Sequence, residues 1–367
     1  MNRRAFLHLS ITASAASQFP LVATTARAQS KAFNPRPGTW NTYEITTRVA
    51  IVKPTGVTRT WIPLPAVEGE YQKLGGNKWS GNGRVMEPAT DGSYGAQMLY
   101  AEWPAVESAP VVEIVSRFHT QDRMIDWSRK SPATLDPTMV RKWTQPTDLL
   151  PTDGIVKDTA DEIVQGKRTD LDKTRAVYDW ILANTHRDPK VRGCGTGDIK
   201  AMLETKSFGG KCADLNGLFV GLVRAVGVPA RDVYGIRVAP SAFGYRSLGA
   251  GSPNITKAQH CRAEVFLQDY GWVAMDPADV AKAAREETSE AIPLDHPLIA
   301  AVRPKLFGGW EGNWLAYNVA HDVKLPRSTQ GDKVGFLMYP QAETAEGRRD
   351  ELDPDSFKYT ITTRVLG

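Results

Sequence analysis

Residues 208–230 read FGGKCADLNGLFVGLVRAVGVPA, and this stretch decides the fold that we expect for the centre of the chain. Its apolar side chains recur at intervals of three and four residues, which is the period of a buried helix. Gly227 and Pro229 mark the end of that helix. Cys212 falls in the first turn on the apolar stripe, so its thiol is expected to face inward at the helix N-terminus. The stripe consists of Leu215, Leu218, Phe219, Leu222, Val223 and Val226.

A thiol in the first turn of a helix has an unusual electrostatic environment. The unpaired N–H groups and the helix dipole favour the thiolate, which is the form that attacks a carbonyl carbon. Gly209 and Gly210 leave room for a substrate beside Cys212. The alternative interpretation is a buried cysteine that serves as a small hydrophobic side chain. A catalytic role therefore requires a base elsewhere in the sequence.

His260 is the base that the sequence offers. It opens HCRAEVFL, which alternates as a strand, and GWVAMDP returns and ends at Asp276. A three-residue loop at 269–271 pairs residue 268 with residue 272 and places Asp276 opposite Glu264. His260 and Asp276 then share a face of the hairpin. Direct contact between His260 and Asp276 would need a bulge or a turn centred earlier. The alternative, non-catalytic interpretations are a histidine at a strand edge and an aspartate in a turn.

The rest of the chain divides into regions of different pattern. Residues 38–130 contain short alternating runs separated by Gly and Pro, which predicts an N-terminal β domain of sandwich type. Residues 131–153 are rich in proline and are interpreted as a linker. The region 154–290 begins with helices at 155–165 and 171–184, the second capped by Asp170, and continues with strands, an α+β order. Residues 291–367 form a C-terminal β extension that packs on the rest.

Two similar segments lie near opposite ends of the chain. YEITTRV at 43–49 is nearly repeated as YTITTRV at 359–365. Seven residues are too few to indicate duplication, because two strands with alternating Thr and apolar faces give the same pattern. The similarity does suggest that the C-terminal strands join or pack on the N-terminal sheet.

The first 28 residues resemble an export signal. Arg3 and Arg4 precede an uncharged stretch, and Ala26-Arg27-Ala28 fits a cleavage site, so we expect a twin-arginine signal peptide and a periplasmic or secreted protein. Removing residues 1–28 takes three of the 45 basic residues and no acid, which leaves 42 basic against 41 acidic residues. Such a near-neutral chain argues against a nucleic-acid or anionic-membrane binder. No other segment is apolar enough to span a membrane.

Three cysteines, an odd number, leave at least one thiol unpaired within the chain. Cys194 and Cys261 could pair as a disulfide and spare Cys212. No cysteine has the CxxC or Cys/His spacing of a metal site, so we expect neither a metal nor another cofactor. Trp310 and Trp314 could line a groove, although packing between strands is the favoured interpretation.

The blocks GGKCADLNGLFVGLVRAVGVPARDVYG, HCRAEVFL and GWVAMDP, in this order, resemble the transglutaminase-like superfamily of papain-related cysteine enzymes. The resemblance covers residues 155–285 and implies an α+β, papain-like core with a helical part and an antiparallel sheet. It also implies a catalytic triad in which Cys212 is the nucleophile, His260 the base and Asp276 the residue that orients it. Many members have an aromatic residue two positions after the histidine, where this chain has Arg262, which puts the chemistry of the substrate groove in doubt.

The resemblance implies an exported, cysteine-dependent amide-bond enzyme that forms a thioester acyl-enzyme on a peptide or protein substrate. Hydrolysis and acyl transfer to an amine remain open, because the two reactions share the acyl-enzyme. The N–H of Cys212 is the first expected oxyanion donor, and Trp180 is a candidate for the second. The alternative function is a non-catalytic binding or scaffold protein of the cell envelope that has kept the fold.

Overall fold

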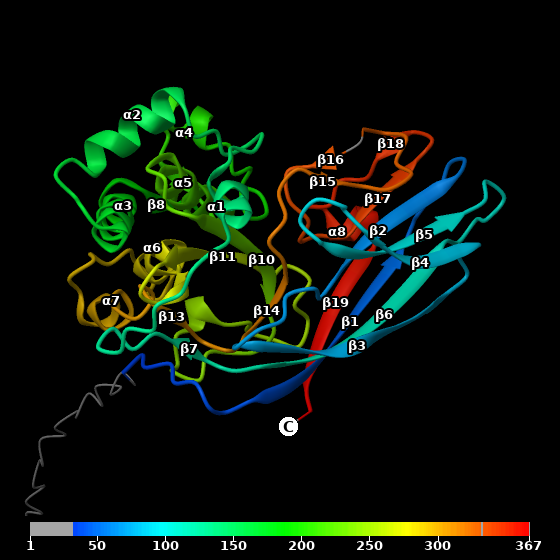
Figure 1. Cartoon of the computed structure of the whole chain (residues 1–367). Coiled ribbons are helices and arrows are strands. Elements are labelled where there is room, and N and C mark those ends of the chain that lie inside the picture. Colours follow the sequence, from blue (N-terminus) through cyan, green and yellow to red (C-terminus); the bar gives the residue numbers. More distant parts are fainter. Residues whose placement is uncertain (1–31, 332, 367) are drawn as a thin grey trace, which may run out of the picture. The chain divides into compact units, whose positions relative to one another are not determined.

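The computed structural model describes residues 32–331 and 333–366 (Figure 1). The expected signal peptide, residues 1–28, lies outside the described residues. The described residues belong to one compact unit in which β-rich regions accompany a mixed α+β region. The α+β fold class expected from the sequence is confirmed.

Two antiparallel sheets build the β-rich region. In the first sheet the order is β19 (Tyr359–Val365), β1 (Asn41–Ala50), β6 (Val111–Thr120) and β3 (Gln72–Gly81). In the second sheet the order is β18 (Gly347–Arg348), β17 (Gln341–Thr344), β2 (Thr58–Leu64), β5 (Gln97–Trp103) and β4 (Val85–Thr90). Val49 of β1, Ile62 of β2 and Leu99 of β5 belong to one buried cluster, so the sheets share a core in the manner of a sandwich.

The similar segments at the two ends of the chain pair with each other. β19 runs antiparallel to β1 over seven residue pairs, from Tyr43 opposite Val365 to Val49 opposite Tyr359. The expectation that C-terminal strands join the N-terminal sheet is therefore confirmed. Figure 1 shows the red β19 beside the blue β1.

A separate four-stranded antiparallel sheet forms the centre of the α+β region. Its order is β12 (Gly271–Met275), β11 (Gln259–Leu267), β10 (Ala230–Arg237) and β14 (Trp314–Asn318). The helices around it are α2 (Gly154–Ile163), α3 (Asp170–Asn184), α4 (Ile199–Thr205), α5 (Cys212–Ala225), α6 (Pro277–Glu286) and α7 (Pro297–Val302). α5 contacts β10 and β11, so the helix that carries Cys212 packs directly on the strand that carries His260.

Local signals explain where the central helices begin and end. Every residue of α5 is buried, as its long apolar stripe predicts, and Gly227 follows with a φ of 81°, which favours glycine. The cap of α3 is Thr169 rather than the expected Asp170, because the Thr169 side chain accepts a hydrogen bond from the N–H of Asp172. The shift is one residue, within the usual uncertainty of helix limits.

The β11–β12 hairpin differs from the expected register. Leu267 pairs with Gly271 and Ala263 with Met275, so the loop is 268–270 and the turn is centred one residue earlier. Gly271 has a φ of 71°, which explains the glycine at this position. The earlier turn moves Asp276 two residues along β11 toward His260. The predicted pairing of residues 268 and 272 is therefore wrong, while the shared face of the hairpin is retained.

Short elements connect these parts. The segment interpreted as a linker contains α1 (Pro137–Thr144), whose Trp143 is buried. α8 (Pro354–Phe357) and a 3-10 turn at Arg246–Leu248 lie in later loops. The paired short strands are β7 (Arg123–Met124) with β13 (Gly309–Trp310), β8 (His186–Arg187) with β9 (Gly209–Gly210), and β15 (Val323–Lys324) with β16 (Lys333–Val334). Across residues 32–331 and 333–366, no helix has the length and apolar character required to cross a membrane.

Candidate active site

Cys212 is the first residue of α5 and lies at the base of a pocket, with 3% of its surface exposed. The carboxylate of Asp214 fixes the helix start by accepting hydrogen bonds from the N–H groups of Lys211 and Gly197, both at 2.9 Å. Gly195 is required beside this carboxylate, because a Cβ there would lie 1.8 Å from Asp214 Oδ2. Asp214 therefore has a capping role, as its position in the first turn suggests.

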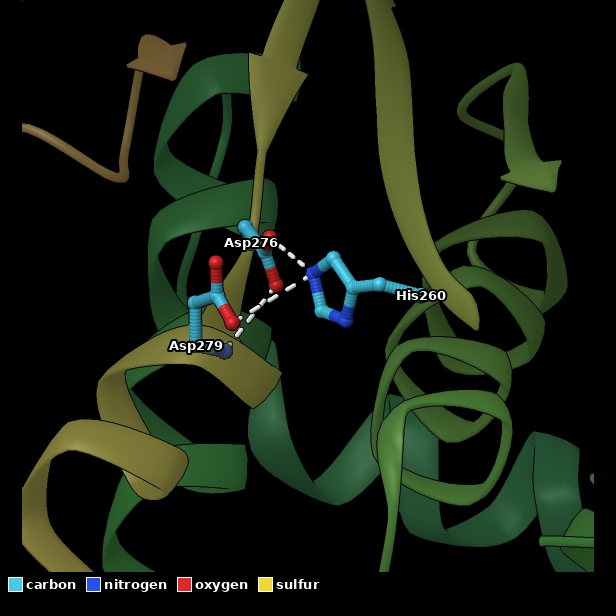
Figure 2. A group of neighbouring side chains, drawn as sticks. All are labelled: His260, Asp276 and Asp279. Atoms are coloured by element: carbon cyan, nitrogen blue, oxygen red, sulfur yellow. Dashed lines mark hydrogen bonds and ion pairs between the residues drawn. The ribbon is translucent and has the colours of Figure 1, made fainter. Parts of the chain in front are cut away.

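His260 and Asp276 make the contact that the sequence left unresolved. His260 lies at the start of β11, and Asp276 follows β12 as the N-cap of α6. The distance from His260 Nε2 to Asp276 Oδ2 is 2.8 Å, and both side chains are buried. Figure 2 shows the other ring nitrogen, Nδ1, on the side of the ring away from the carboxylates. Because Nε2 is held by Asp276, Nδ1 is the ring nitrogen left available, and His260 and Cys212 line the same pocket.

A second carboxylate, that of Asp279, also lies beside the imidazole (Figure 2). Its Oδ1 is 3.4 Å from His260 Nε2, and it forms a buried ion pair with Arg237 at the end of β10. The N–H of Asp279 donates to Asp276 Oδ1 at 3.0 Å, which caps α6 and orients Asp276. Two carboxylates and one guanidinium therefore surround a single imidazole.

The environments of Cys212 and His260 move their pKa values in opposite directions. Burial raises the pKa of the Cys212 thiol, but hydrogen bonds with Cys194, Cys261 and His260, together with the charge of His260, bring it well below its ordinary value. Burial and Arg237 lower the pKa of His260, but the charges of Asp279 and Asp276 outweigh them and raise it to about 9. A thiol of low pKa beside an imidazole of high pKa favours a thiolate–imidazolium pair at neutral pH.

All three cysteines of the chain gather at this place. They are free and belong to one buried cluster, and the interactions of Cys194 and Cys261 with Cys212 contribute to its lowered pKa. Burial and the neighbouring Cys212 raise the pKa of both flanking thiols well above the ordinary value. The described residues therefore hold no Cys194–Cys261 disulfide, and the Cys194 thiol donates a hydrogen bond to the carbonyl of Gln259 at 3.3 Å.

A further layer of side chains holds the histidine and the aspartate in place. Asn216 Nδ2 donates to the carbonyl of Cys261 at 2.9 Å and to Asp276 Oδ1 at 3.2 Å. Trp314 Nε1 donates to the carbonyl of His260 at 2.9 Å. These bonds tie α5, β11 and β14 together around the imidazole, and Trp314 serves packing rather than an open groove.

Arg262, the departure from the family pattern, is a buried part of the same layer. Its guanidinium lies over the rings of Trp314 and Trp310, at 4.6 and 5.1 Å from their centroids. Its Nε is 3.6 Å from Asp276 Oδ2. Arg262 points behind the aspartate and does not line the pocket, so the substitution leaves the pocket wall unaffected.

The pocket above Cys212 and His260 has a volume of about 450 Å³ and is partly open to solvent. Its walls come from β8, the start of α5, α6, the loop 249–259 and the C-terminal segment that contains Tyr339 and Tyr359. Trp180, the candidate oxyanion donor, does not line it and packs against Phe208 with ring centroids 5.7 Å apart. The N–H of Cys212 has no hydrogen-bond acceptor within residues 32–331 and 333–366, so it is free to donate into the pocket.

The side chains of His260, Asp276 and Asp279 are close enough together to hold a metal ion. The charges around them disfavour one. Arg237 already pairs with Asp279, and Arg262 lies 3.6 Å from Asp276, so a further cation would meet two buried guanidinium groups. The group is better suited to holding a protonated imidazole.

The structure thus brings together the three expected residues and adds several that the sequence did not identify. Arg237 and Asp279 had no recognisable signal, apart from the spacing of three between the two aspartates of Asp276-Pro-Ala-Asp279 on one helical turn. The position of Asn216, one turn after Cys212 on a fully buried helix, could have indicated its role. A buried polar side chain requires partners, and here they are the backbone of β11 and Asp276.

A buried cysteine at a helix N-terminus, an imidazole on the adjoining strand and a carboxylate behind it define the papain-like class of arrangement. Residues 157–277 match the model of the transglutaminase-like superfamily, and the chain belongs to that superfamily. An uncharacterized protein of Haemophilus influenzae is 34% identical over 341 residues, which cover 88% of this chain and 91% of that one.

Two solved structures are similar to this chain at low sequence identity. A Putative Cysteine Protease from Cytophaga hutchinsonii is 13% identical, covers 89% of this chain and 99% of its own, and superposes with a TM-score of 0.52. The periplasmic domain of TgpA from Pseudomonas aeruginosa, 14% identical over 72% of this chain and 93% of its own, has a TM-score of 0.32. The first likeness supports the transglutaminase-like fold, and the second is too weak to support an argument.

Proposed function

We propose that the chain is a cysteine-dependent amide-bond enzyme in which Cys212, His260 and Asp276 form the catalytic triad. The observation that carries the proposal is the chain of contacts from a thiol of low pKa at a helix N-terminus, through a buried imidazole, to a buried carboxylate. This chain of contacts opens onto a pocket. The three groups have the relationship that nucleophile, base and orienting residue require.

In the proposed reaction the Cys212 thiolate attacks the carbonyl carbon of an amide and forms a C–S bond. The negative charge that develops on the carbonyl oxygen is stabilised by the free N–H of Cys212. The imidazolium of His260 then gives its proton to the leaving nitrogen, the C–N bond breaks and the amine departs. Water or a second amine, deprotonated by His260, attacks the thioester and restores the Cys212 thiolate.

Asp276 acts in this scheme by holding the Nε2–H of His260, so that Nδ1 faces the sulfur. Its carboxylate also stabilises the imidazolium, and Asp279 adds to that stabilisation. Arg237 neutralises much of the charge of Asp279, which limits how strongly the site retains the proton. The site is therefore suited to a histidine that stays protonated until the leaving group requires its proton.

The first test measures the reactivity of Cys212 with iodoacetamide across a range of pH, using peptide mapping to identify the labelled cysteine. We expect a reactive form that persists well below the ordinary thiol pKa of about 8.5. Ordinary reactivity at Cys212 would instead favour the scaffold alternative. A second test profiles peptide, glutamine-amide and amine-donor libraries, with Cys212→Ala as the blank, and distinguishes hydrolysis from transfer by the released product. Full activity of Cys212→Ala would exclude the triad.

We also propose that the protein works in the periplasm or outside the cell, because residues 1–28 have the features of a twin-arginine signal. Replacing Arg3 and Arg4 together by Lys is expected to leave the full-length precursor in the cytoplasmic fraction, because the signal depends on the arginine pair. Fractionation and intact mass report both location and cleavage. Unchanged export of the double variant would exclude the twin-arginine route.

A further inference from the structure

Among the described residues, the pocket above Cys212 is lined by five lysine and arginine side chains, besides His260, and by no acidic one. The basic residues are Arg187, Lys211, Arg237, Lys257 and Lys282. This imbalance is local, because the chain without its first 28 residues is almost neutral. A cleft lined by one sign of charge concentrates ligands of the opposite sign.

Not all five charges are available to a ligand. Arg237 is paired with Asp279, Arg187 with Glu286 at 2.8 Å, and the exposed Lys257 with Asp355 at 3.6 Å. The ion pairs therefore neutralise these three. The charges that remain come from the two other lysines.

Lys211 and Lys282 supply the unbalanced charge. Lys211 is the residue before Cys212, and its ammonium has no acidic partner in the described part of the chain. Lys282 lies on α6 with its side chain 19% exposed. Its ion pair with Glu286 is long, at 4.0 Å, and Arg187 already engages Glu286 at 2.8 Å. Burial and the neighbouring Arg237 lower the pKa of Lys282 to about 8, so it is mostly protonated at neutral pH.

These groups converge at one end of the pocket. β8 pairs in parallel with β9, which places Arg187 opposite Gly210, directly before Lys211. Lys282 is close enough to Arg187 and Arg237 for their charges to act on its pKa. A ligand at this end therefore meets two ammonium groups whose charges are not fully neutralised, next to the sulfur of Cys212.

Resting on the proposed function, we infer that the preferred substrate carries a carboxylate next to the scissile amide, and that Lys211 and Lys282 recognise it. The carboxylate could belong to an acidic side chain or to a free C-terminus, and both offer the same chemistry to the two ammonium groups. A substrate carboxylate would neutralise two lysines that lie close to other cations. A substrate with a carboxylate should therefore bind more tightly than the same substrate with an amide in its place. In this assignment the lysines determine specificity and take no part in the chemical step.

The inference can be tested before any substrate is known, with two alkylating reagents that differ in charge. In both reactions the Cys212 sulfur forms a bond to the methylene carbon and iodide leaves, but iodoacetate carries a carboxylate and iodoacetamide does not. We expect the iodoacetate-to-iodoacetamide rate ratio at Cys212 to exceed that of mercaptoethanol about tenfold. The excess should fall as salt is raised from about 0.1 M to about 1 M.

Two variants assign the effect to the lysines. Lys211→Gln and Lys282→Gln are each expected to lower the ratio about threefold, and the double variant should remove most of the excess. Since iodoacetamide reports the amount of thiolate in the same variant, a change in the pKa of Cys212 cancels in the ratio. Lys200→Gln, on the exposed face of α4, is the matched control and should leave the ratio unchanged.

The outcomes separate this inference from the proposed function. A reactive Cys212 whose ratio equals that of mercaptoethanol, or does not respond to the two lysine variants, would overturn the inference and leave the triad intact. Failure of both reagents to label Cys212 in the folded chain would overturn the triad and the inference together. With active enzyme, matched peptides that end in a free acid, end in an amide, or carry Glu or Gln beside the scissile bond would identify the source of the carboxylate.

Discussion

Replacing Asp276 by asparagine isolates the electrostatic part of its role. Asparagine has nearly the same shape and remains a good N-cap, so the start of α6 should be preserved. What is lost is the negative charge 2.8 Å from His260 Nε2. The pKa of His260 is raised from 6.5 to about 9, and this difference is worth about 3 kcal/mol of preference for the imidazolium.

Most of that preference should come from Asp276, since Arg237 neutralises much of the second carboxylate, Asp279. We therefore expect the Asp276→Asn variant to have a His260 pKa that lies below 9 and closer to its ordinary value of 6.5. The pKa of the Cys212 thiol should rise in the same variant, because less of the imidazolium that stabilises the thiolate is present. The thiolate–imidazolium pair should then be the main form over a narrower range of pH than in the unmodified protein.

The measurement is an NMR titration of protein labelled with ¹³C-histidine, in which His260→Gln assigns the signal, combined with the pH dependence of Cys212 alkylation. Asp161→Asn, which removes an exposed carboxylate that pairs with Lys157, is the control and should change neither value. A His260 pKa that stays near 9 in the Asp276→Asn variant would refute the electrostatic reasoning. Asp279 would then be the residue that stabilises the imidazolium.

Three further predictions concern the surroundings of the site. Gly195→Ala should lower the free energy of unfolding by about 2 kcal/mol or more in urea denaturation, because φ is 92° and the new Cβ would collide with Asp214. Cys261→Ala should raise the pKa of Cys212 in alkylation experiments, because the interaction with the Cys261 thiol that helps to lower this pKa is lost. Burial raises the pKa of Asp232 from 3.8 to about 7, so the folded state binds its proton more tightly and stability falls as pH rises from about 4 to about 7. Asp232→Asn should remove about 2–3 kcal/mol of the stability difference between pH 5 and pH 8, and an unchanged difference would contradict this origin.

The sequence predicted the parts of the fold that depend on local pattern. The apolar stripe of α5, the limits set by Gly227 and the alternating strands were sufficient for the central region, and the paired segments at 43–49 and 359–365 indicated one long-range contact. The hairpin register could not be fixed, because loops at 268–270 and 269–271 both contain acceptable turn residues. This shift of the loop by one residue decides whether Asp276 can reach His260.

The candidate site was predictable to the extent that its residues stand in recognisable motifs. Cys212, His260 and Asp276 do, whereas Arg237 lies at the end of a strand whose neighbours give no indication of a charge cluster. The gathering of Cys194 and Cys261 on Cys212 depends on a loop and a strand that are distant in sequence. Contacts of this kind follow from tertiary packing, which no local pattern specifies.

The pairing of β19 with β1 has a consequence for the order of events during synthesis. β19 follows β1 at a great distance in the sequence and pairs with it at the edge of the sheet, so residues 43–49 are made long before their partner at 359–365. This sheet is therefore complete only after residues 359–365 have been made, and the contact joins residues of very large sequence separation, which slows folding.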